Sequence, residues 1–164
     1  MDRYVAELKK VLEPLCQRFE GLHALFQEER GMLTARRADD LEAMAQRIRA
    51  ELEEVARLEK RRRQLVEVIA ARLKLTSKQP TLLELDQALG GGSGLPEWRA
   101  RLLDRVERAE KVNRDNLAAF KGVMSANEAV MGVLTGSRKE SLYNRHGYRQ
   151  QGISGGYSLF SRQL

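Results

Sequence analysis

The chain has 164 residues, enough for one domain, and its single cysteine, Cys16, excludes an intrachain disulfide framework or a cysteine-pair metal site. No apolar run approaches the roughly 20 residues that span a bilayer, and the N-terminus lacks a signal-peptide layout, so we expect a cytoplasmic protein without membrane insertion. Charged residues make up 32% and the net charge is +6, a composition more typical of long, surface-charged helices than of a compact enzyme.

The first predicted helix covers residues 2–33. Its apolar residues are spaced alternately by four and three, which is typical of a helix packed against another helix; they are Leu8, Leu12, Leu15, Phe19, Leu22 and Phe26. Leu33 keeps this phase, although Glu29 interrupts it. Pro14 cannot donate a hydrogen bond to the carbonyl one turn back, so we expect a kink or a fresh start there.

The second predicted helix covers residues 39–74, about 54 Å at 1.5 Å per residue. Asp39 and Glu42 form a capping-box pattern at its start. An apolar stripe follows, made of Leu41, Met44, Ile48, Leu52, Val55, Leu58, Leu65, Ile69 and Leu73. Arg62 takes one position of the stripe, where we expect its stem to lie along the groove with its charge in water. Acidic residues interleave with the basic run 60–63, which favours a solvated face over specific nucleic-acid binding.

A short helix is predicted over 82–89, because Thr81 and Glu84 repeat the capping-box pattern and Gly90 follows as a stop. Residues 90–94 are four glycines and one serine, the composition of a flexible linker. Pro96 then suits the first turn of a third long helix, which we predict over 96–134.

The third long helix keeps an unbroken four-three alternation from Leu102 to Leu134. Its stripe holds three asparagines, Asn113, Asn116 and Asn127. Each asparagine could fix the register by hydrogen bonding across the helices, or some of them could meet the backbone of a partner. Spacing alone leaves both interpretations open.

The charge of this helix falls sharply along its length. Eleven of the 21 residues 96–116 are charged, against two of the 18 residues 117–134. The apolar stripe of the second part is wider than one neighbouring helix would cover, so the segment is either buried by two neighbours or a surface for an amphipathic partner. The candidate partner-binding residues are Asn113, Asn116, Leu117, Phe120, Val123, Met124, Asn127, Val130, Met131, Leu134 and Tyr143.

Residues 135–164 contain five glycines, three of the four tyrosines and a net charge of +4. So few aliphatic residues cannot offset an ordering cost of roughly 1–2 kcal/mol per residue. We therefore expect a mobile tail after a helical domain over 1–134.

Residues that carry chemistry are scarce. The two histidines have no metal-ligand spacing, and the glycine run lacks the Lys-Ser/Thr and the preceding strand of a phosphate loop. The carboxylates lie among arginines at helical spacing, which ion pairing explains. We expect no enzyme, no metal and no cofactor.

With these elements in place, the chain resembles the FlgN-like flagellar export chaperones over most of its length. Asn113-Arg114-Asp115-Asn116-Leu117 is similar to the Asn-x-x-Asn that precedes the apolar helix end of that family. Leu142-Tyr143-Asn144-Arg145-His146-Gly147 is similar to its Tyr-x-x-x-Gly tail element. Pro14 and the four-glycine linker depart from the family pattern.

The resemblance implies a cytoplasmic type III export chaperone. Such chaperones bind the C-terminal helical segment of hook–filament junction proteins and present it to components of the flagellar export apparatus. We predict an all-α fold, an antiparallel bundle of three long helices with coiled-coil-like packing and a C-terminal tail. The alternative is a structural, stalk-like coiled-coil component of the same apparatus, and a third possibility is polyanion binding by the basic tail.

Overall fold

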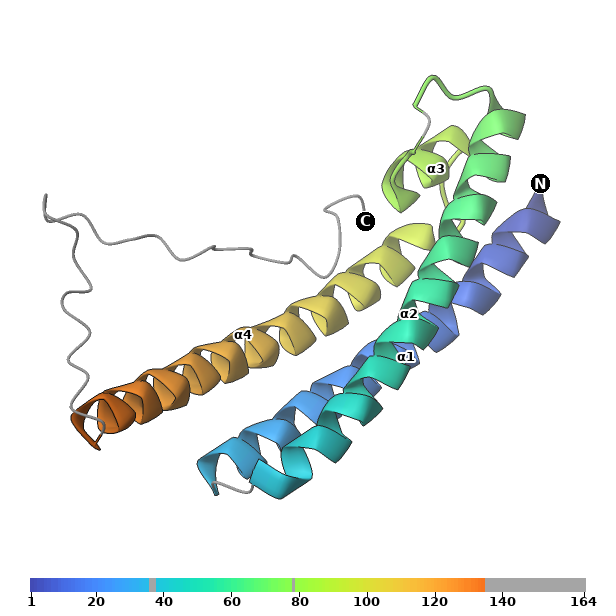
Figure 1. Cartoon of the computed structure of the whole chain (residues 1–164). Coiled ribbons are helices and arrows are strands. Elements are labelled where there is room, and N and C mark those ends of the chain that lie inside the picture. Colours follow the sequence, from blue (N-terminus) through green and yellow to red (C-terminus); the bar gives the residue numbers. More distant parts are fainter. Residues whose placement is uncertain (36–37, 78, 135–164) are drawn as a thin grey trace, which may run out of the picture.

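The computed structural model describes residues 1–35, 38–77 and 79–134. This part of the chain forms four α-helices and no strand, so the predicted all-α class is confirmed. The helices are α1 (Asp2–Thr34), α2 (Ala38–Leu73), α3 (Leu82–Ala88) and α4 (Leu95–Leu134) (Figure 1). None of the helices in this part of the chain is long and apolar enough to cross a membrane.

Helices α1 and α2 form an antiparallel hairpin. Two ion pairs join them, Arg18 to Glu51 at 3.0 Å and Glu28 to Arg47 at 2.9 Å. From the first pair to the second, the residue numbers rise along α1 and fall along α2, so the two helices run in opposite directions. All six apolar residues of the first predicted stripe are buried. Helix α1 continues through Pro14, so the fresh start does not occur. We attribute this to the buried Leu12, Leu15 and Cys16, whose packing offsets the one missing hydrogen bond.

Helix α4 runs beside α1 and in the same direction. Arg105 pairs with Glu20 at 2.7 Å and Arg30 pairs with Asp115 at 3.2 Å, both across a separation of 85 residues. Helix α1 therefore lies against both α2 and α4, whereas no Cα atom of α2 lies within 8 Å of a Cα atom of α4. Mutual packing of all three long helices is not observed in the described residues, and the antiparallel three-helix bundle with coiled-coil-like packing stays a prediction.

The short helix α3 closes one end of the molecule, where it packs against α2 and α4. Thr81 caps it through the full capping box with Glu84, as the sequence predicts. The glycine segment that follows has defined contacts, because the buried carboxylate of Asp86 accepts hydrogen bonds from the backbone and side chain of Ser93. Gly91 has a φ of 83°, a backbone conformation that favours glycine.

The sequence predicts that the charge of Arg62 lies in water, and this prediction is wrong. Its side chain is buried at 4% exposure, and its guanidinium donates two hydrogen bonds to the carboxylate of Glu59, at 2.7 and 2.8 Å. Arg63 donates a third to the same carboxylate at 3.1 Å. The physical reason is local pairing, because a carboxylate three residues back supplies the partner that lets a guanidinium enter the stripe.

Candidate functional site

Helix α4 continues past the end of α1. At the offset fixed by the two ion pairs, Thr34 at the end of α1 lies level with residue 119. Residues 120–134 of α4 therefore extend about 22 Å further, at 1.5 Å per residue. Figure 1 shows this orange end of α4 standing apart from the hairpin. The α4 stripe that packs on α1 is thus continued by residues with no helix of the described chain over them.

The predicted binding residues divide at this point. Asn116 is buried and Asn113 is half-buried. The residues that follow expose about half of their large apolar side chains, from 46% at Phe120 to 58% at Val130. We call these exposed residues the distal face: Leu117, Phe120, Val123, Met124, Val130 and Met131.

Besides Asn113 and Asn116, three of the predicted residues do not belong to the distal face. Asn127 is exposed on the same part of α4 but is polar. Leu134 ends α4, and its side chain lies outside the described residues, as do Tyr143 and the whole predicted tail over 135–164. Of the two interpretations of 117–134, burial by two neighbours is not what the structure shows through Met131. A contiguous apolar surface of this kind marks an interaction site more often than a free surface.

A cleft of about 440 Å³ lies at the inner end of the distal face, between the end of α1, the start of α2 and α4. Its apolar lining is Leu33, Leu41, Ala45, Leu117 and Phe120. Its polar lining is Glu29, Glu42, Asn113 and Asn116. The cleft has the size of a pocket that takes several side chains of a partner, and it is continuous with the distal face through Leu117 and Phe120.

Asn116 ties α4 to the end of α1. Its Nδ2 donates to the carbonyl oxygen of Phe26 at 2.7 Å and to the carboxylate of Glu29 at 2.8 Å. This is the register-fixing hydrogen bonding that the sequence offered as one interpretation of the stripe asparagines. The Oδ1 of Asn116 is buried without a hydrogen-bond partner. The other amide of the pair, Asn113, lines the cleft beside it.

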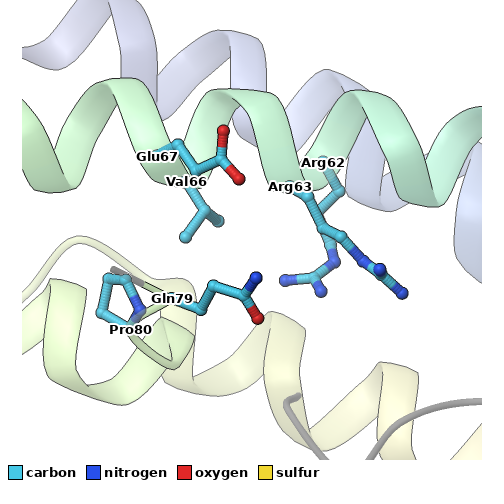
Figure 2. Close-up of a pocket in the computed structure, with 6 residues that line it drawn as sticks. All are labelled: Arg62, Arg63, Val66, Glu67, Gln79 and Pro80. Carbon is cyan, nitrogen blue, oxygen red and sulfur yellow. The ribbon is translucent and has the colours of Figure 1, made fainter. Parts of the chain in front are cut away.

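Other candidate sites in the described residues are weaker. A pocket of about 20 Å³ lies between α2 and the connection to α3, room for about one water molecule. Figure 2 shows that Arg62 and Arg63 extend into it from α2, opposite Gln79 and Pro80. Cys16 is buried in the core, and burial raises the pKa of its thiol, which lowers its reactivity. The described residues contain no cluster of three His, Cys, Asp or Glu residues that could hold a metal ion.

Sequence reasoning missed the side of the cleft that α1 and α2 supply. Those residues are Glu29, Leu33, Leu41, Glu42 and Ala45. One signal was present, since Glu29 interrupts the first apolar stripe one helical turn before Leu33. A carboxylate at a stripe position indicates that the helix there faces a polar group or an opening, and the partner is Asn116.

A model of the FlgN protein family matches residues 1–151, which is most of the chain. No match was found among curated proteins or among solved structures. The chain belongs to the FlgN family, the flagellar export chaperones.

Proposed function

We propose that this protein is a cytoplasmic, non-enzymatic export chaperone that binds the C-terminal helical segment of hook–filament junction proteins and delivers them to the flagellar export apparatus. Membership of the FlgN family supports the chaperone role. One observation supports the binding mode: the distal face is apolar, contiguous and exposed, although it continues the stripe that packs on α1. An amphipathic helix of the cargo would cover it as α1 covers the first half of α4.

The composition of the distal face suits this role. Met124 and Met131 lie one above the other, seven residues apart, beside Phe120. Methionine side chains are flexible and polarisable, so they adapt to helices of different sequence. A chaperone that serves more than one junction protein gains from such a surface. The cargo helix would pack on the distal face, where no helix of the described chain covers α4.

The proposal is tested by placing a charge on the distal face. Leu117→Asp and Met124→Asp should each abolish binding of a junction protein's C-terminal segment, measured by calorimetric titration, because a buried carboxylate without a partner opposes association. Helicity measured by circular dichroism should be unchanged, since both side chains are already about half exposed. If the two variants unfold instead, the distal face is part of the core and the proposal fails.

Ser125→Asp is the matched control, because Ser125 is exposed on the opposite side of α4. It should bind the segment like the unaltered chain. We also propose that Tyr143 and the adjoining tail close over the bound segment. A chain ending at Leu134 should then bind more weakly than the full chain, and equal affinity would remove Tyr143 from the site.

The alternative, a stalk-like structural component, needs only the α1–α2 hairpin as a rod. Removing everything after Gly90 should spare such a function and destroy that of a chaperone. The exposed distal face supports the chaperone, because a rod of two helices gains nothing from an apolar surface on a third.

A further inference from the structure

The described lining of the cleft includes two acidic residues and no basic residue. Glu29 and Glu42 are the charged residues of the lining. The Glu29 carboxylate accepts from the amide of Asn116 at 2.8 Å, and that of Glu42 accepts from the amide of Gln46 at 3.2 Å. Both donors are neutral, and neither carboxylate has an ion pair within the described part of the chain.

The contacts between helices just outside the cleft are different. There, Glu28 is paired with Arg47 at 2.9 Å and Asp115 with Arg30 at 3.2 Å. Arg30 and Arg47 are therefore already engaged with other carboxylates. Within residues 1–35, 38–77 and 79–134, Glu29 and Glu42 line the cleft without an ion pair to a basic residue.

A second observation in the same cleft is independent of these charges. Asn116 is 3% exposed, lines the cleft, and leaves its Oδ1 buried without a hydrogen-bond partner. An unpaired buried oxygen is unfavourable, so it calls for a donor. Two carboxylates and this unpaired amide oxygen thus belong to residues that line one cleft with an apolar floor.

We propose that the cleft receives a basic side chain, a lysine in particular, at the inner end of the partner helix whose apolar stripe covers the distal face. An ammonium has three N–H donors and a positive charge, which correspond to the two carboxylates and the Oδ1 of Asn116. The apolar lining, including Leu33 and Leu41, packs on the methylene stem of the lysine. This inference rests on the proposed function and adds the chemistry that fixes the position of the cargo helix along α4.

The test is a titration of the full chain with a synthetic peptide of a junction protein's C-terminal helical segment, at low and at high salt. The peptide is also made with its basic residues replaced one at a time by norleucine, which keeps the stem and removes the charge. The protein is used unaltered, as Glu42→Gln, and as Glu53→Gln. Glu53 is exposed further along α2, outside the cleft, so it controls for the change in net charge.

Glu42→Gln should weaken binding about tenfold and reduce its salt dependence, because a charge-assisted hydrogen bond is lost. One norleucine peptide should bind the unaltered chain about tenfold more weakly, and Glu42→Gln should add no further loss for that peptide. Glu53→Gln should bind like the unaltered chain. Equal affinity of Glu42→Gln and the unaltered chain, or losses that multiply for every peptide, would overturn the inference.

The outcomes separate this inference from the proposed function. If Met124→Asp abolishes binding while Glu42→Gln leaves it unchanged, the distal face binds the cargo and the cleft takes no cation. If no peptide binds the unaltered chain, the proposed function fails and the inference fails with it. Light scattering tests whether a second copy of this chain occupies the cleft instead. A dimer that Leu117→Asp dissociates would assign the cleft and the distal face to self-association and would overturn the inference.

Discussion

At the scale of single residues, the buried pair of Glu59 and Arg62 shows how a charged residue can hold a stripe position. Burial raises the pKa of Glu59, but the hydrogen bonds and charges of Arg62 and Arg63 outweigh this and hold it below its ordinary value. The spacing of Glu59 and Arg62 was visible in the sequence. Their burial was not predictable, because it depends on how the hairpin and the connection before α3 pack around them.

This pairing makes a prediction for stability. Glu59→Gln leaves the guanidinium of Arg62 buried without an anionic partner, which should cost about 3 kcal/mol in the free energy of unfolding, measured with urea at pH 7. Glu53→Gln, at an exposed position of the same helix, should change little. An unchanged free energy in the Glu59 variant would mean that the ion pair contributes nothing to the fold.

The same pair sets a pH dependence. A carboxylate whose pKa is lowered by folding contributes stability that is present above its unfolded pKa, about 4.3, and is lost as the pH falls through the folded value. The unaltered chain should therefore lose stability over the interval below about pH 4.3. The Glu59→Gln variant should lose less over the same interval, which urea unfolding at each pH would show.

At the scale of elements, α4 has one repeating pattern and two environments. The spacing and the fall in charge after Asn116 were readable from the sequence, and they marked the segment whose large apolar side chains are exposed. Whether residues 117–134 were core or surface stayed open, because the answer depends on the offset between α1 and α4. That offset is set by tertiary contacts such as Arg105 with Glu20, which helical spacing does not contain.

Two glycines test the backbone requirements of the elements. Gly91 has a φ of 83°, so Gly91→Ala should lower the free energy of unfolding by about 1–2 kcal/mol. Gly122 lies inside α4, and a Cβ there would meet nothing within 4 Å, so Gly122→Ala should stabilise the helix by up to about 1 kcal/mol. Urea unfolding followed by circular dichroism measures both changes. If both substitutions change the free energy of unfolding in the same direction, the backbone conformations assigned to Gly91 and Gly122 are contradicted.

At the scale of the whole molecule, the described chain has a packed end and an open end. At the packed end α3 packs against α2 and α4 (Figure 1), and Leu82, Leu85 and Leu95 are fully buried. At the open end α4 continues alone past the hairpin. The family resemblance predicted the family that the comparison shows, and the sequence pattern named the α4 residues of the candidate site. The carboxylates of α1 and α2 that line the cleft, Glu29 and Glu42, were not predicted, because only the folded chain brings them beside α4.

Capture of a partner helix by the open end of α4 is tested most directly by hydrogen–deuterium exchange of the full chain with and without cargo. In the free chain, the amides of 120–134 should exchange fastest among those of α4, since a helix of this length is marginal without packing. A saturating C-terminal segment of a junction protein should slow exchange in 117–134 and around Glu29 and Glu42. Protection confined to the packed end, with 117–134 exchanging as in the free chain, would contradict the account.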